Sequence, residues 1–151
     1  MVALPETNAI VRRLNALLQI HSRSLPVYLA YAQPWTPWGG ERVIEVLRLV
    51  AEDQLRRVDQ IANYIQELGD VVVTGAFPMD YTELHDLSAD FVLHKAVRQQ
   101  RQSVERIRQL SQELAADPRA KALAEEALGA AKGHLQTLEE LISQTQTEPA
   151  A

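Results

Sequence analysis

The chain has 151 residues, a formal net charge of −5 and no cysteine. Its length suits one domain with a single core, so residues 1–151 are treated as one unit. Acidic residues outnumber basic ones by 20 to 15, which excludes a one-sided basic field for nucleic acid. The absence of cysteine excludes disulfides, thiolate metal sites, cysteine nucleophiles and Fe–S clusters, and it fits a cytoplasmic protein.

The first helical pattern occupies the N-terminal part of the chain. Apolar residues recur on one stripe from Ile10 to Tyr28 and predict a helix over about residues 7–33. Pro26 lies inside this helix and should kink it, because proline removes one backbone hydrogen bond and clashes with the preceding turn. Residues 24–40 are uncharged, but prolines and glycines interrupt them. A membrane span needs about 20 continuous apolar residues, so none is expected.

A second helical pattern runs over about residues 41–68, and Gly69 follows it as a suitable C-terminal cap. The next connection, about residues 70–84, is long enough to cross the whole length of a helical bundle. Such a crossover makes the second and third helices parallel.

The last two helical patterns cover the C-terminal half of the chain. Apolar residues at helical spacing predict a third helix over about residues 86–115. The pair Asp117-Pro118 suits the N-cap and first residue of a fourth helix, which we expect over about residues 118–143. The tail, residues 144–151, is polar and is expected to fray.

Two stretches carry a resemblance to a known family. Residues 14–39 read LNALLQIHSRSLPVYLAYAQPWTPWG, and the fourth helix contains Gly133-His134-Leu135. The first stretch resembles the first helix and turn of bacterioferritins without a gap, and the second resembles the family's Glu-x-x-His helix without its Glu. The resemblance implies an all-α, ferritin-like four-helix bundle with a long crossover between helices two and three. The haem-binding methionine of bacterioferritins corresponds to Leu55 here, so no haem is expected.

The resemblance also places the six positions that hold the di-iron ligands in this family. A ferritin-like di-iron site takes a Glu from each of two helices and a Glu-x-x-His from each of the other two. The four Glu positions and two His positions fall on His21, Gln54, Arg57, Gln100, Ala131 and His134. Helical periodicity alone selects Gln100. Neutral amides bind hard cations weakly and an arginine cannot ligate, so we expect neither a di-iron site nor ferroxidase activity.

Several interpretations of these residues stay open at the level of sequence. His21 and His134 either form a mutually hydrogen-bonded core cluster with Gln54 and Gln100, or hold a single ion such as zinc. Arg57 either points outward or faces a polar pocket that binds a small anion.

Tyr28 matches a tyrosine that is common near the metal site of the family. It either borders this site or simply packs in the core.

The resulting hypothesis is a non-catalytic ferritin-like bundle that serves as a structural or interaction module with an unidentified protein partner. We expect a homodimer, because residues 25–32 and 43–50 are apolar around more than one face and need cover on a second side. The alternative cover is residues 71–77 of the crossover, folded over this surface within one chain.

Overall fold

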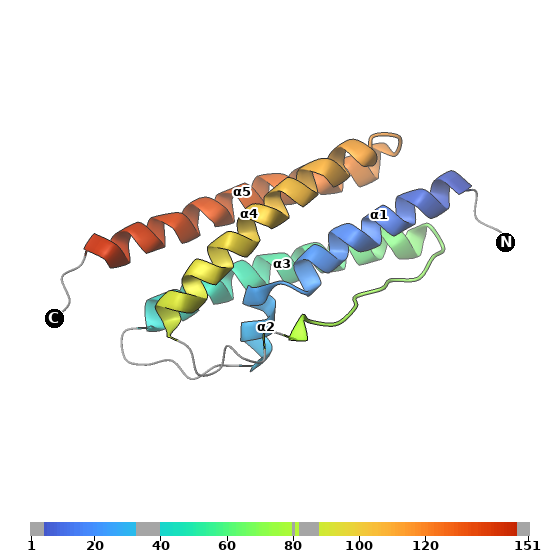
Figure 1. Ribbon diagram of the computed structural model, residues 1–151. Helices are drawn as coiled ribbons and strands as arrows, with labels where there is room; N and C mark the ends of the chain where they lie inside the picture. The colour runs from blue at the N-terminus through green and yellow to red at the C-terminus, as the bar shows by residue number, and fades with distance from the viewer. Residues whose placement is uncertain (1–4, 33–39, 80, 82–87, 148–151) are drawn as a thin grey trace.

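The computed structural model describes residues 5–32, 40–79, 81 and 88–147. Within these residues the chain forms five α-helices and no strand. In chain order, the helices are α1 Pro5–Ser22, α2 Leu25–Ala32, α3 Glu41–Glu67, α4 Ala89–Glu113 and α5 Pro118–Thr147. The four long helices lie side by side in an elongated bundle, and the short α2 turns away from the axis of α1 (Figure 1). The predicted all-α, four-helix architecture is therefore confirmed.

The first predicted helix is two helices rather than one kinked helix. α1 ends at Ser22 and α2 begins at Leu25. Pro26 lies in the first turn of α2, where its missing N–H would have had no intrahelical partner in any case. The hydroxyl of Ser24 accepts a hydrogen bond from the backbone N–H of Val27 at 3.3 Å and so caps the new helix. The proline therefore starts a second helix instead of bending the first.

The C-terminus of α3 matches the sequence-based expectation. Gly69 has a φ of 78°, and its N–H donates to the Gln66 carbonyl at 2.9 Å. The N–H of Asp70 donates to the Ile65 carbonyl at 3.2 Å, which completes a Schellman motif. The chain then runs back along the bundle as an extended crossover, so that α3 and α4 point in the same direction (Figure 1).

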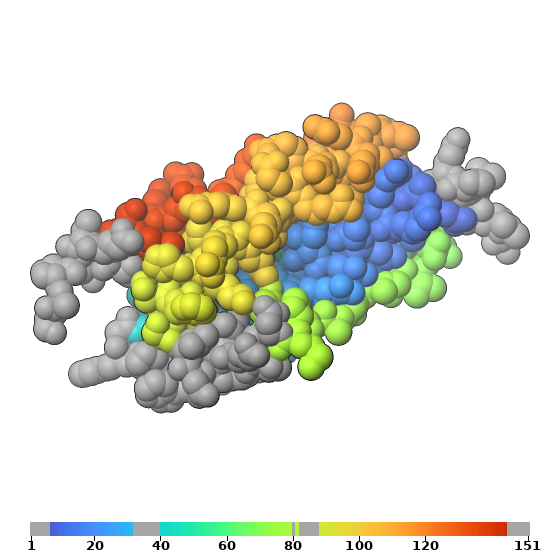
Figure 2. Space-filling model, viewed as in Figure 1, coloured from blue at the N-terminus to red at the C-terminus, as the bar shows by residue number. Residues whose placement is uncertain are grey.

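Polar side chains of α1 hold the extended crossover in place. The amide of Asn15 accepts from the backbone N–H of Val73 at 2.8 Å and donates to the carbonyl of Val71 at 3.1 Å. One turn later, the Gln19 amide donates to the Val73 carbonyl at 2.8 Å. Side chains of α1 thus satisfy backbone hydrogen-bonding groups of this extended segment, as a neighbouring β-strand would. The segment lies against α1 on the molecular surface (Figure 2).

The last two helices differ from the prediction mainly in their ends. α4 begins at Ala89 rather than near residue 86, because the Ser88 hydroxyl accepts from the Phe91 N–H at 3.2 Å and forms the N-cap. Asp117 caps α5 as expected, accepting from the N–H groups of Arg119 and Ala120. α5 continues to Thr147, beyond the predicted end at residue 143.

Two groups of buried apolar residues fill the bundle. One joins α1, the second half of α3, the second half of α4 and the first half of α5. The other joins α2, the first half of α3, the start of α4 and the second half of α5, together with Tyr81. The polar cavity described below is lined by residues of all four long helices. Among the described helices, none is both long enough and apolar enough to cross a membrane.

The surface predicted to pair two chains is largely covered within one chain. Leu25, Val27 and Leu29 of α2 are buried. The ring of Tyr28 packs against those of Phe77 and Tyr81, with centroids 5.3 and 5.4 Å apart. The end of the crossover thus packs against much of the apolar surface of residues 25–32, for which the sequence pattern predicted a packing partner.

Candidate functional site in the bundle core

All six residues that the family resemblance singled out line one small buried cavity. They are His21 from α1, Gln54 and Arg57 from α3, Gln100 from α4, and Ala131 and His134 from α5. Asp53, Ile20, Ser103, Ile107 and Ala130 complete the lining. About 10 Å³ is open to the centre of a water molecule. A single water needs about 10–15 Å³ by this measure, so the remaining space suits one water.

The centre of the cavity wall is an ion-pair cluster around Asp53. The Nε2 atom of His134 lies 2.7 Å from Asp53 Oδ2, and Nε of Arg57 donates to the same oxygen at 3.2 Å. Burial favours a raised pKa for the Asp53 carboxyl, but the hydrogen bond from His134 and the charge of Arg57 outweigh it and lower the pKa. Arg57 therefore faces the core and carries its own counter-ion there.

His21 is the most deeply buried ionisable group in the cavity. Its Nδ1 lies 2.8 Å from the Leu17 carbonyl, which can only accept, so Nδ1 carries the proton. Burial lowers the pKa of His21 to about 4, and the nearby charge of Arg57 acts in the same direction. The imidazole is thus neutral at pH 7, and its Nε2 holds a lone pair that is free to accept a hydrogen bond.

The two glutamines find partners outside the predicted polar cluster. The Gln54 carbonyl oxygen accepts from the Ser24 hydroxyl at 2.6 Å. The Gln100 amide donates to the backbone carbonyl of Ala131 at 3.1 Å. The predicted mutual hydrogen bonding of His21, Gln54, Gln100 and His134 is therefore wrong, because backbone carbonyls, Ser24 and Asp53 were nearer partners.

Tyr28 is not part of the cavity lining. It packs in the aromatic group with Phe77 and Tyr81 at the α2 end of the bundle. The packing interpretation of this tyrosine is the one that the geometry supports. The turn at Trp38-Gly39, which carries part of the family resemblance, lies outside the described residues.

The donor set of this cavity does not fit a di-iron centre. Two divalent irons need several anionic oxygen ligands, whereas Asp53 is the one carboxylate in the described lining and is already shared by Arg57 and His134. Ala131 has no donor atom in its side chain. Among the described residues, no group of three or more His, Cys, Asp or Glu side chains is placed to hold a metal ion.

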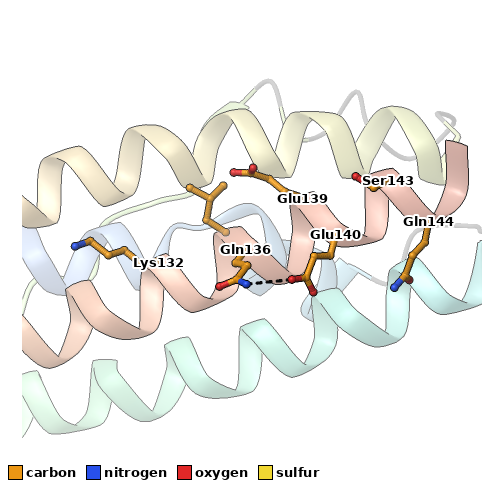
Figure 3. Close-up of a pocket in the computed structure, with 7 residues that line it drawn as sticks. Lys132, Gln136, Glu139, Glu140, Ser143 and Gln144 are labelled. Atoms are coloured by element: carbon orange, nitrogen blue, oxygen red, sulfur yellow. Dashed lines mark hydrogen bonds between the residues drawn. The ribbon is translucent and has the colours of Figure 1, made fainter. Parts of the chain in front are cut away.

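A larger hollow than the core cavity lies elsewhere, along α5. Residues of this one helix, among them Lys132, Leu135, Gln136 and Glu140, border an open groove of about 590 Å³. In Figure 3 the Gln136 amide reaches the Glu140 carboxylate, one turn further along the same helix. Because one helix supplies all of the described lining, the described residues form a shallow surface groove without converging polar groups.

Sequence reasoning missed two residues of the site, Asp53 and Ser24. Asp53 precedes Arg57 by four residues on a helix, a spacing at which opposite charges meet, so the pattern could have revealed this pair. Its contact with His134 joins residues 81 positions apart and has no local signal. Ser24 lies two residues before Pro26, which is a recognisable start of a helix.

The arrangement of helices described above is that of a known protein family. Residues 11–147 match the ferritin family with its ferritin-like domain, and the chain belongs to that family. No curated protein sequence matches the chain.

Two solved structures illustrate the likeness of fold. The bacterioferritin of Rhodobacter capsulatus, described with a metal-free dinuclear site and haem iron, superposes with a TM-score of 0.77 at 18% identity. The match covers 91% of this chain and 85% of the bacterioferritin chain. A two-domain protein of Anabaena variabilis, with DJ-1/ThiJ/PfpI-like and ferritin-like domains, superposes with a TM-score of 0.74 at 18% identity. That match covers 96% of this chain and 41% of the Anabaena chain.

Proposed function

We propose that this ferritin-like chain has lost the di-iron site and acts as a non-catalytic structural or interaction module in the cytoplasm. The observation that carries the proposal is the Asp53–Arg57–His134 cluster. The guanidinium of Arg57 and the ring of His134 meet one carboxylate oxygen, at 3.2 and 2.7 Å, in the wall of the central cavity. A permanently charged arginine in this position repels a metal ion, and it is paired with the one carboxylate of the described lining that could attract a metal ion.

The charge count of the cavity supports the same proposal. In iron-binding relatives of this architecture, four carboxylates balance two metal ions. In the described lining, one carboxylate is balanced by one arginine and a histidine. The guanidinium of Arg57 thus takes the electrostatic part that metal ions have in such bundles.

Elemental analysis tests the proposal directly. We expect purified protein to carry less than about one iron per two chains after incubation with ferrous iron, and to show no ferroxidase kinetics, because the donor set lacks the anionic oxygens that iron needs. Stoichiometric iron with rapid ferrous oxidation would contradict the proposal.

A variant with restored donors provides the matched control. It carries His21→Glu, Gln54→Glu, Arg57→His, Gln100→Glu and Ala131→Glu together, which recreates four carboxylates and two histidines at the six cavity positions. We expect this variant to gain iron binding that the natural sequence lacks. If the natural chain and the variant bind equal amounts of iron, the substituted residues do not explain the proposed loss of iron binding.

A second candidate function is a mononuclear metal site at His21 and His134. The observation that favours it is the backbone hydrogen bond of His21, because donation from Nδ1 to Leu17 leaves Nε2 oriented and unprotonated, as in many metal-bound histidines. Zinc that remains after dialysis and disappears in His21→Gln would establish this function. The anion-binding alternative beside Arg57 is less favoured, because Asp53 already neutralises the guanidinium and the cavity holds about one water.

We also propose that two copies of the chain form a homodimer. Tyr31 at the end of α2 and Leu49 in α3 remain 70% and 58% exposed, and both come from the two segments whose apolar surface suggested pairing. Exposed large apolar residues of this kind mark candidate interaction surfaces. The described chain already covers their neighbours, so the interface would be smaller than the sequence alone indicates.

A further inference from the structure

A second pocket, with two arginines in its lining, opens on the surface between α1, the crossover and α4. It has a volume of about 240 Å³. Its apolar lining includes Ile20, Pro78 and Tyr81, and its charged lining consists of Arg23 and Arg106. Ile20 and Ser103 line both this pocket and the core cavity, so the pocket lies directly outside the cavity.

Arg23 is fixed in position at this pocket. Its Nε donates to the Thr74 carbonyl at 3.2 Å. Its guanidinium lies against Gly75, where a Cβ atom would overlap it, and Gly75 adopts a φ of 72° that favours glycine. The side chain is thus held on two sides by the crossover, while its terminal N–H groups have no hydrogen-bond acceptor among the described residues. A pre-oriented cation costs little entropy when it binds an anion.

The two arginines of the pocket lack the counter-ions that neighbouring arginines have. In α4, Arg101 lies 3.8 Å from Glu139, and Arg108 pairs with Glu105. By contrast, neither Arg23 nor Arg106 forms an ion pair within the described part of the chain, and Arg106 donates only to the amide of Gln109 at 3.4 Å. The described lining contains no carboxylate. Two cations without a counter-ion among the described residues therefore share one surface pocket in a protein whose net charge is −5.

We propose that this pocket binds a small organic anion, a phosphate monoester or carboxylate with a short apolar body. The guanidinium groups of Arg23 and Arg106 suit the charged head, because arginine forms bidentate hydrogen bonds with phosphate and carboxylate. Ile20, Pro78 and the ring of Tyr81 suit the apolar body. A volume of about 240 Å³ limits the ligand to a small molecule. This site is independent of the proposed loss of iron.

Titration of the isotope-labelled full-length chain with phenyl phosphate and benzoate tests the site. We expect saturable shifts of the arginine Nε–H signals of Arg23 and Arg106 with a Kd in the low-millimolar range. Inorganic phosphate should bind about tenfold more weakly than phenyl phosphate, because it lacks the apolar body. Equal affinities for inorganic phosphate and phenyl phosphate would overturn the assignment to organic anions.

The Arg106→Ala variant carries the decisive comparison, because the one hydrogen bond of Arg106 among the described residues is long, to Gln109, and the fold should not depend on it. We expect about a tenfold loss of phenyl phosphate affinity. The matched control is Arg48→Ala, which removes an exposed arginine of α3 that does not line this pocket and forms no ion pair with a described residue, and it should leave the affinity unchanged. Equal losses in the two variants, or equal shifts at all exposed arginines, would reduce the effect to non-specific attraction and overturn the proposal. Arg23→Ala, checked for an intact crossover by the Val73 amide signal, should abolish saturable binding.

Discussion

At the scale of residues, Asp53 organises the interior of this bundle. One of its oxygens meets both Arg57 and His134, and the other lies 3.3 Å from a terminal nitrogen of Arg56. Asp53 is half-buried, so the loss of these donors should cost less than the about 3–5 kcal/mol that is typical of a fully buried ion pair. The cluster therefore acts as a unit, and its members should tolerate substitution poorly one at a time.

The buried His21 predicts a loss of stability in mild acid. Its pKa in the folded chain is about 4, against an ordinary value of 6.5. Between these values the unfolded chain binds a proton that the folded chain excludes, so the free energy of unfolding should fall as the pH decreases from 6.5 to about 4. Above pH 6.5 the neutral His21 makes its full contribution to the free energy of unfolding. The whole effect amounts to about 3 kcal/mol at about 1.4 kcal/mol per pH unit.

Urea unfolding between pH 4 and 7 measures this dependence. In His21→Gln the slope across this range should become shallower, because the substituted residue does not titrate. The control is His94→Gln, which replaces an exposed histidine of α4 and should retain the original slope. An unchanged slope in His21→Gln would show that this histidine is accessible to protons in the folded chain.

At the scale of elements, the crossover is a separate structural unit that depends on α1. The backbone N–H of Val73 donates to the side chain of Asn15, whereas Gln19 binds the carbonyl of the same residue. Replacing Asn15 by Ala should remove the acceptor and increase the hydrogen-exchange rate of the Val73 amide by about fivefold, as expected for the loss of roughly 1 kcal/mol of protection.

The variant Gln19→Ala supplies the control for this exchange experiment, because it removes a bond to the carbonyl and leaves the amide acceptor in place. Its Val73 amide should exchange nearly as slowly as in the natural chain. Equal acceleration in both variants would mean that the crossover detaches as a whole instead of through single hydrogen bonds.

Tyr64 joins α3 to the start of α5, at the end of the bundle where the crossover begins. Its hydroxyl donates to Asp117 at 2.6 Å, and Arg119 stacks over the ring at 4.6 Å while it pairs with Glu67. The variant Tyr64→Phe should lose about 1–2 kcal/mol of stability, because a hydrogen bond to a charged acceptor disappears. Chemical denaturation measures the loss, and Tyr31→Phe, at an exposed site, should match the natural chain.

The same tyrosine gives a spectroscopic check on its environment. Burial, followed by the hydrogen bond to Asp117, raises the pKa of Tyr64 to about 12 from 10.0. One tyrosine should therefore ionise late in an ultraviolet titration, and the late step should vanish in Tyr64→Phe. Since the unfolded chain loses this proton first, stability should fall as the pH rises from 10 to about 12.

At the scale of the whole molecule, the open question for experiment is whether the chain pairs. Light scattering at micromolar concentration should give a mass near twice 16.9 kDa. Tyr31→Glu should split the dimer, because it places a charge on an exposed apolar residue of the proposed interface. The control Phe91→Glu, on α4, should leave the mass unchanged. A mass near 16.9 kDa for the natural chain would show that α2, α3 and the crossover complete their own cover.

The amino-acid sequence by itself determined the helices, the crossover and the six positions around the cavity. Helical periodicity and local signals such as Gly69 and Asp117 act over a few residues, so they can be read from a single chain. The family resemblance then related distant positions to one site. Pro26 was recognised as a disruption, but whether it bends a helix or starts a new one depends on the Ser24 cap and its partners.

Only the tertiary structure decided how the polar interior is satisfied. The partners of His134, Gln54 and Gln100 come from other parts of the fold, namely Asp53, Ser24 and the carbonyl of Ala131. The pocket of Arg23 and Arg106 likewise needs the crossover to lie against α1 and α4. Helical spacing fixes which side chains face inward, but the side chain that each one meets is set by the rotation and offset of packed helices, which no local pattern records.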